Sequence, residues 1–118
     1  MVLVDTSVWV AHLREGNSGL EALLDEGDVM CHLFIIGELA CGNLENRAEI
    51  FSLLRALPRV THAEHEEVMH FIEGHGLMGK GLGYIDIHLL ASAMLTKVLL
   101  WTLDRKLNEI SSKLGLSF

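Results

Sequence analysis

Short apolar runs alternate with stretches of helical periodicity along the whole of this sequence. Residues 2–4, 29–33 and 97–101 have the composition of short buried strands, and residues 59–61 and 116–118 are further strand candidates. Strands that alternate with helices build a parallel sheet that is covered by helices on both faces. We therefore expect an α/β fold of three layers, with a short parallel sheet of four or five strands.

The segments between these runs carry apolar residues three and four positions apart, which is the spacing of an amphipathic helix. Gly27, Pro58 and Gly115 each stand where such a segment ends. Five glycines among residues 74–83 predict a loop. The predicted helices cover residues 8–14, 20–26, 34–41, 47–57, 63–73, 85–95 and 104–114.

Composition limits the class of protein. The length of 118 residues predicts a single domain over residues 1–118, and a hydrophobic share of 50% excludes a disordered chain. The net charge of −7 argues against a strongly basic nucleic-acid clamp. Cys31 and Cys41 are too few for a disulfide scaffold, and we interpret both as small buried residues in a reducing compartment. Neither a basic leader nor a membrane-length apolar run is present, so we expect a cytoplasmic protein that does not enter membranes.

Four acidic residues stand in apolar surroundings, where a solvated acid is not expected. Asp5 and Asp104 follow predicted strands, whereas Glu38 and Asp86 lie near the starts of predicted helices. Parallel sheets bind ligands outside the carboxyl ends of their strands, so we expect the four carboxylates to converge at that edge. Taken singly, Asp5 and Asp104 are also explained as helix caps or as the polar ends of strands.

Four carboxylates at one place repel one another. At a separation of about 6 Å and an effective dielectric constant of about 20, each pair costs about 2.8 kcal/mol. A cation offsets this repulsion, and a set of oxygen-only ligands selects Mg²⁺ or Mn²⁺ over Zn²⁺. Such a site suits phosphodiester hydrolysis. The hydroxyls of Thr6, Ser7 and Thr102 neighbour two of the acids in the sequence, and we expect them to orient the carboxylates.

Three basic residues are candidates for contact with the phosphates of a nucleic acid. Lys80 lies in the predicted loop, Arg14 ends the first predicted helix, and Arg105 directly follows Asp104. Each of them is also explained as a solvated charge on the surface.

Seven histidines raise the alternative of a zinc site. His65 and His70 lie about 140° apart around a helix, as do His70 and His75, so these residues do not share a face. Neither an HExxH motif nor a CxxC pair is present. We therefore interpret the histidines as surface residues, and His88 as a structural or interfacial residue.

Four segments of the chain resemble, in order, the motifs of PIN-domain ribonucleases, and in particular those of VapC-type toxins from toxin–antitoxin pairs. They read VLVDTSVW (2–9), IGEL (36–39), GKGLGYIDIHLLASA (79–93) and LWTLDRKL (100–107). The resemblance spans nearly the whole chain and implies a PIN-like α/β/α fold with an acidic Mg²⁺ or Mn²⁺ pocket. The residues that match the family's catalytic and metal-binding acids are Asp5, Glu38, Asp86 and Asp104, and those that match its polar companions are Thr6, Ser7 and Thr102.

The same resemblance implies a function. It implies a metal-dependent RNA endonuclease that forms a homodimer, acts as the toxin of a type II toxin–antitoxin system and is inhibited by a VapB-type antitoxin. Two alternatives stay open. One is a non-catalytic PIN-like binding module. The other is a phosphatase with Asp5 as nucleophile, although that chemistry favours a second acid two residues later, where Ser7 stands.

Overall fold

The sheet consists of three parallel strands. The computed structural model describes residues 1–118, and its strands are β1 (Val2–Val4), β2 (Val29–Met30) and β3 (Leu99–Trp101), in the order β2-β1-β3. Val2 of the central strand lies opposite Val29 on one side and Leu99 on the other. Because all pairs are parallel, the carboxyl ends of the strands meet at one edge of the sheet. The predicted α/β class is confirmed.

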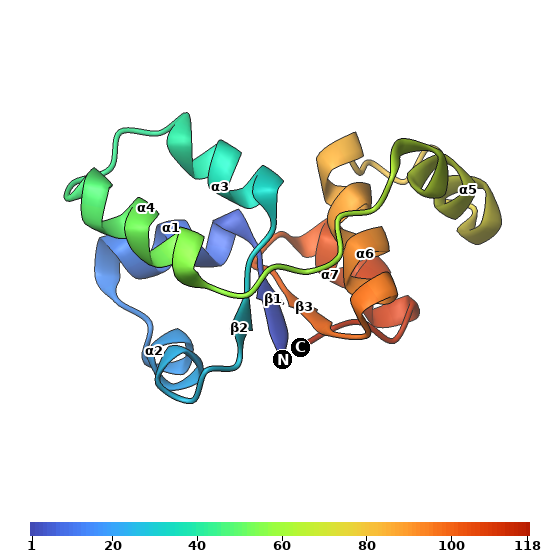
Figure 1. Ribbon diagram of the computed structural model, residues 1–118. Coiled ribbons are helices and arrows are strands. Elements are labelled where there is room, and N and C mark those ends of the chain that lie inside the picture. The colour runs from blue at the N-terminus through green and yellow to red at the C-terminus, as the bar shows by residue number, and fades with distance from the viewer.

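Seven helices surround this short sheet (Figure 1). All seven were predicted from periodicity, and their bounds differ from the prediction by a few residues at most. In chain order they are α1 (Thr6–Glu15), α2 (Ser18–Asp25), α3 (Leu33–Ala40), α4 (Arg47–Ala56), α5 (His65–His75), α6 (Tyr84–Thr96) and α7 (Arg105–Lys113).

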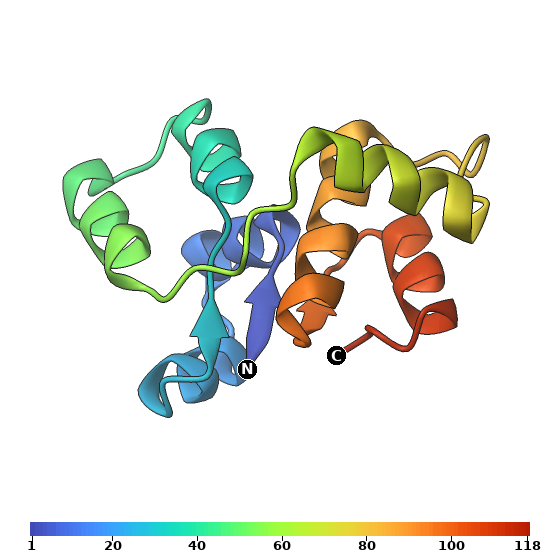
Figure 2. The ribbon, with the colours of Figure 1, turned by 45° about the vertical axis from the view of Figure 1, so that its right-hand side comes forward.

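The helices form two groups, with the sheet between them. In Figures 1 and 2, α1 to α4 lie on one side and α5 to α7 on the other. Residues 57–64, which we call the crossing segment, run from α4 to α5 and pass between α3 and α6 in both views. This arrangement gives an elongated molecule with extents of 40 × 24 × 23 Å.

Helix α6 and strand β1 form the centre of the hydrophobic core. All three residues of β1 are buried, and so are residues 87–93 of α6, an uninterrupted run. A helix that is buried on every side shows little amphipathic periodicity, which explains the mostly apolar sequence of α6. No helix has the length and apolar character needed to cross a membrane.

The sheet has fewer strands than the four or five predicted, because two expected strands form only single bridges. Arg59 makes an isolated parallel bridge with Cys31. Pro58 lacks an N–H group for a ladder, and the N–H of Thr61 donates to Oγ1 of Thr96 instead of to a strand.

The strand predicted at residues 116–118 also forms only a single bridge. Ser117 bridges Leu100, but the N–H of Leu116 donates back to the carbonyl of Ser111 at the end of α7. This bond closes the end of the helix, so one residue pair is all that the segment adds to the sheet.

The predicted strand at residues 29–33 is also shorter than expected. It ends at Met30, because His32 is the N-cap of α3 and its Nδ1 accepts a hydrogen bond of 2.9 Å from the N–H of Phe34. The expectation for the cysteines is half right, since Cys31 is buried whereas Cys41 is exposed.

Candidate metal site of four carboxylates

Asp5 lies at the carboxyl end of the central strand and is 7% exposed. It occupies the N-cap position of α1, but its side chain makes no capping bond. Its Oδ2 instead accepts hydrogen bonds of 2.8 Å from the hydroxyl of Ser7 and 2.7 Å from that of Thr102. The helix-cap explanation therefore does not account for this carboxylate.

The same two hydroxyls tie Asp5 to the backbone that leads into α7. Ser7 Oγ accepts the N–H of Leu103 at 3.0 Å, and Thr102 Oγ1 accepts the N–H of Asp104 at 3.0 Å. Each hydroxyl thus donates a hydrogen bond to the Asp5 carboxylate and accepts one from a backbone N–H in the segment that follows β3. This arrangement fixes Asp5 relative to Asp104, although 99 positions separate them in the chain.

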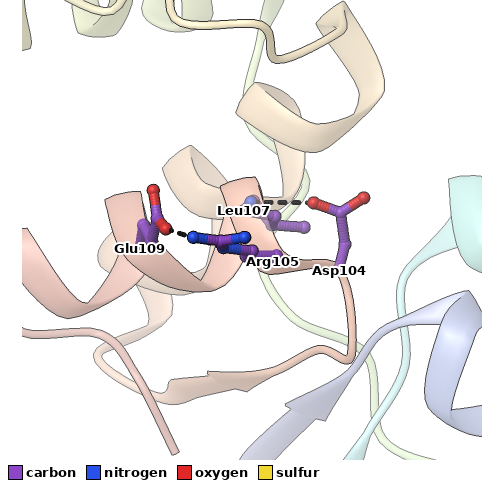
Figure 3. A network of polar contacts seen from close by, with 4 residues as sticks. All are labelled: Asp104, Arg105, Leu107 and Glu109. Atoms are coloured by element: carbon purple, nitrogen blue, oxygen red, sulfur yellow. Dashed lines mark hydrogen bonds and ion pairs between the residues drawn. The ribbon is translucent and has the colours of Figure 1, made fainter.

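Asp104 is exposed and is the N-cap of α7. Its Oδ1 accepts the N–H of Leu107 at 2.9 Å, as drawn in Figure 3. The cap explanation therefore holds for one of its oxygens. The other oxygen makes no hydrogen bond within the protein.

Glu38 is exposed on α3, the helix that follows β2. Its Oε1 accepts a hydrogen bond of 2.8 Å from the hydroxyl of Thr6, which lies in the first turn of α1. Thr6 directly follows Asp5, so this bond draws the carboxylate of Glu38 toward the end of β1.

Asp86 is half-buried in the first turn of α6. Its Oδ2 accepts the N–H of Gly83 at 3.3 Å, a contact typical of the third residue of a helix. Burial raises the pKa of Asp86, the bond from Gly83 opposes this shift, and the negative charges of Asp5 and Asp104 add to it. Asp5 and Asp104 are therefore close enough to Asp86 for their charges to act on it.

One pattern is common to the four acids. Each uses one oxygen in a hydrogen bond that orients it and has a second oxygen without a hydrogen bond in the protein. No basic residue offsets their charge, since the protein's single ion pair joins Arg105 to Glu109. Oriented carboxylate oxygens without a basic partner are the donor set that suits Mg²⁺ or Mn²⁺.

Of the three predicted phosphate-binding residues, Arg105 and Arg14 are directed or placed away from the nearest of these acids. Arg105 extends along α7 to Glu109, with 3.3 Å between Nε and Oε1, and Figure 3 shows it directed away from the Asp104 carboxylate. Arg14 lies near the other end of α1 from Asp5, about 13 Å along the helix axis. Lys80 is exposed in the loop before α6 and makes no ion pair.

A basic residue of α7, Lys106, contacts that loop. The ammonium of Lys106 packs against Gly81, so that a Cβ at this glycine would come within 2.9 Å of Nζ. Gly81 has a φ of +79°, a conformation that also favours glycine. The glycine-rich sequence of the loop indicates that another group packs closely against its backbone, but it does not indicate that this group is the side chain of Lys106.

Sequence reasoning also missed a cluster of histidines. His32 and His88 are 1% and 2% exposed, and their rings are joined by a hydrogen bond of 3.0 Å. His62 lies beside them on the surface. The comparison of His65, His70 and His75 could not find this cluster, because its members come from three separate parts of the fold. The only local signal was the spacing of His88 and Ser92, four residues apart on one helix.

Comparison with known families agrees with the fold. The model of the PIN domain family matches residues 2–113. The chain therefore belongs to the PIN-domain family.

Individual relatives indicate which kind of PIN domain this chain resembles. The chain is 37% identical to Ribonuclease VapC32 of Mycobacterium tuberculosis, in strain H37Rv and in strain CDC 1551 alike, over 99% of this chain and 95% of the relative. Among solved structures, it resembles the crystal structure of PAE2754 from Pyrobaculum aerophilum with a TM-score of 0.60 and 16% identity, over 97% of this chain and 88% of that one. The first likeness places the chain with VapC-type PIN domains, and the second supports the fold alone.

Proposed function

We propose that this chain is a metal-dependent endoribonuclease and the toxin of a type II toxin–antitoxin system. The observation that carries the proposal is the set of four carboxylates, each oriented through one oxygen and free at the other, with no basic partner. The relative from M. tuberculosis, which is named a ribonuclease and matches over nearly its full length, supports RNA as the substrate.

Asp5, Glu38, Asp86 and Asp104 are the residues that would hold Mg²⁺ or Mn²⁺. When bound, such an ion supplies Lewis acidity and neutralises charge on a phosphodiester as it is hydrolysed. Zn²⁺ fits this donor set poorly, because the four ligands include neither a histidine nitrogen nor a cysteine sulfur.

The polar residues around the site hold the acids in place. Ser7 and Thr102 direct their hydroxyls at Oδ2 of Asp5, which keeps Oδ1 available, and Thr6 does the same for Glu38. A carboxylate oxygen that is not occupied by a hydrogen bond accepts the proton of the attacking water. Lys80, Arg14 and Arg105 remain predictions for contact with the RNA backbone.

The unpaired acids also define the expected protein partner. A VapB-type antitoxin that brings an arginine to the site would satisfy the carboxylates with paired hydrogen bonds. We further propose a cytoplasmic homodimer, which sedimentation at micromolar concentration checks. It is supported by large apolar side chains that are exposed in the loop before α6 and at the start of that helix, namely Met78, Tyr84 and Ile85.

Two other functions fit the fold less well. A non-catalytic PIN-like module has no need of four unpaired acids, all of which are present here. A phosphatase with Asp5 as nucleophile favours an acid two residues later, and Ser7 at that position donates a hydrogen bond to Asp5.

RNA digestion tests the proposal. The purified chain should cleave RNA with Mg²⁺ or Mn²⁺ and stop when EDTA is added. Asp5→Asn should reduce cleavage by about 100-fold or more, because it removes one anionic ligand while the amide oxygen still accepts the bonds from Ser7 and Thr102. Asp25→Asn, at an exposed acid that ends α2, is the matched control and should cleave like wild type. Cleavage that persists in EDTA, or that Asp5→Asn leaves unchanged, would refute the proposal.

A further inference from the structure

Two buried histidines join the helices that carry Glu38 and Asp86. His32 is the N-cap of α3, and His88 lies in α6. Their rings meet edge to face, with 3.0 Å between Nε2 of His32 and Nδ1 of His88. Both rings are almost fully buried, so this contact must be satisfied within the protein.

The direction of the hydrogen bond between His32 and His88 follows from the role of His32 as a helix cap. Nδ1 of His32 accepts the N–H of Phe34 at 2.9 Å, so that nitrogen carries no proton. The proton of the neutral ring is then on Nε2, which donates it to Nδ1 of His88. Burial, and then the neighbouring His88 and His62, lower the pKa of His32 to about 3, which agrees with a neutral ring.

One nitrogen from each of His32, His62 and His88 lies within 4.8 Å of the others, which is close enough to hold a metal ion. The direction of the hydrogen bond from His32 to His88 argues against such a metal centre. A histidine that binds a metal through one nitrogen usually donates a hydrogen bond from the other. In His32 the other nitrogen faces an N–H donor instead. Metal binding through Nε2 would therefore break the cap of α3.

A serine connects the histidine pair to the crossing segment. Oγ of Ser92 lies 3.2 Å from Nε2 of His32 and 3.3 Å from Nδ1 of His88, and it accepts the N–H of Ala63 at 3.2 Å. One turn later on α6, Oγ1 of Thr96 accepts the N–H of Thr61. The network thus joins α3, α6 and the crossing segment between them.

The network is relevant to the acids because α3 and α6, which it joins, carry Glu38 and Asp86. Helix α3 starts at the His32 cap and carries Glu38. His88 and Asp86 are two residues apart, about 200° around α6, so their side chains leave the helix on nearly opposite sides. The two helices are not among the elements in extensive contact, and the crossing segment passes between them in both ribbon views. The histidine hydrogen bond and the packing of Phe34 on the His88 ring, with 4.5 Å between ring centroids, connect the two helices directly.

We propose that the hydrogen bond from His32 to His88 is a positioning contact, which sets the separation of α3 and α6 and with it that of the Glu38 and Asp86 carboxylates. The role of these acids rests on the proposed function, whereas the separation of the helices does not. His32 and His88 touch no substrate in this account and act only through the two helices.

Substitutions separate the bridge from the cap. His32→Asn keeps an acceptor for the N–H of Phe34, because asparagine is a strong N-cap, but its side chain is too short to reach His88. His88→Leu removes the acceptor. His88→Asn restores it, because its amide oxygen takes the place of Nδ1. Val68→Ala is the control for lost stability alone, since Val68 is fully buried on α5, which carries none of the four acids.

The first readout is independent of metal and of activity. Spin labels at Cys41, the exposed C-cap of α3, and at a cysteine introduced by Leu95→Cys on α6 report the separation of the helices, while Cys31 is buried and stays unlabelled. We expect a single narrow distance distribution in wild type, His88→Asn and Val68→Ala, and a broadened or displaced one in His32→Asn and His88→Leu. Unchanged distributions in the last two variants, measured where thermal unfolding shows them folded, would overturn the proposal.

The second readout is Mn²⁺ affinity together with RNA cleavage. His32→Asn and His88→Leu should weaken Mn²⁺ binding by about 10-fold or more and lower kcat more than they raise KM, because the ligands are misplaced rather than removed. His88→Asn and Val68→Ala should bind Mn²⁺ like wild type. Wild type that neither binds Mn²⁺ nor cleaves RNA would refute the proposed function and leave the spin-label result to decide the bridge. Binding of Zn²⁺ that depends on all three histidines would overturn the bridge in favour of a metal centre.

Discussion

At the scale of single residues, hydroxyl groups organise the acidic site. Ser7 and Thr102 each donate to Asp5 and accept an N–H from the loop that leads to α7. Because each hydroxyl has both a donor and an acceptor role, neither can rotate away without leaving a polar group unsatisfied. The position of Asp5 is therefore determined by its neighbours and not by a helix cap.

Removing one of these hydroxyls should weaken metal binding without removing a ligand. Ser7→Ala leaves Oδ2 of Asp5 with one donor and frees the N–H of Leu103, and we expect Mn²⁺ affinity to fall by about 10–100-fold. Calorimetric titration of metal-stripped protein measures this change. Ser112→Ala, at an exposed serine of α7, is the control. Equal affinity in Ser7→Ala and wild type would show that the hydroxyl does not orient the site.

The buried histidine gives a dependence of stability on pH. The pKa of His32 is lowered to about 3 by burial and by the two neighbouring histidines, against 6.5 for an unperturbed ring. Between these values the unfolded chain binds more protons than the folded chain, so the free energy of unfolding falls as pH decreases below 6.5. From pH 7.5 to pH 5, this residue should cost about 2 kcal/mol of stability.

Urea denaturation at the two pH values checks this expectation against His32→Asn, which has no ring to protonate. The variant should lose less stability than wild type over the same interval, by about the same 2 kcal/mol. The carboxylates titrate in both proteins and cancel in the comparison. An identical loss in the two proteins would mean that His32 takes up its proton in the folded state.

At the scale of helices and strands, periodicity was a sufficient guide to the helices but not to the strands. Apolar spacing predicted all seven helices, and residues 2–4 were correctly predicted as a strand of a parallel sheet. The strand predicted at residues 97–101 is present but begins at Leu99, because Lys97 is the C-cap of α6. The strand at residues 29–33 was predicted too long, because the capping role of His32 depends on a side-chain contact that apolar periodicity does not encode. The outer strands reduced to bridges because their N–H groups have other partners or, at Pro58, do not exist.

The candidate acidic site rests on a different kind of signal, and its convergence stays a prediction. Asp5 and Asp104 follow strands and Asp86 lies in the first turn of α6, and parallel topology brings strand ends to one edge. Glu38 was expected near the start of its helix but lies in the second half of α3, because that helix already begins at Leu33. The histidine bridge was not predictable, because it joins residues 56 positions apart, and no local pattern records how two helices are oriented. The same reason explains why Lys106 was not distinguished from the basic residues near it.

The start of α7 separates the capping role of Asp104 from its proposed role as a ligand. Asparagine caps helices as well as aspartate does, so Asp104→Asn should keep the bond to Leu107 and should not destabilise the metal-free protein, in which it also removes repulsion on Asp86. Asp104→Ala should lose about 1 kcal/mol, measured by urea denaturation. Both variants should lose RNA cleavage. If Asp104→Asn cleaved RNA like wild type, Asp104 would be a cap and nothing more.

At the scale of the whole molecule, we expect the proposed metal site to link cation binding to folding. The four acids come from both helix groups and from the end of the central strand, and the pKa of Asp86 is raised by burial and by the charges of Asp5 and Asp104. A carboxyl whose pKa is higher in the folded state than in the unfolded state destabilises the fold at neutral pH, where it is ionised. A divalent ion that binds only the folded chain reverses this effect by mass action.

The most direct test of a shared metal site is the melting temperature of the metal-stripped protein and of Asp86→Asn, with and without millimolar Mn²⁺. Wild type should melt at a higher temperature with Mn²⁺. Asp86→Asn should melt above wild type without metal, because the amide keeps an acceptor for Gly83 while the repulsion is lost, and Mn²⁺ should add little to it. A wild type that does not respond to Mn²⁺, together with an Asp86→Asn variant that melts lower, would show that the four carboxylates do not form one site.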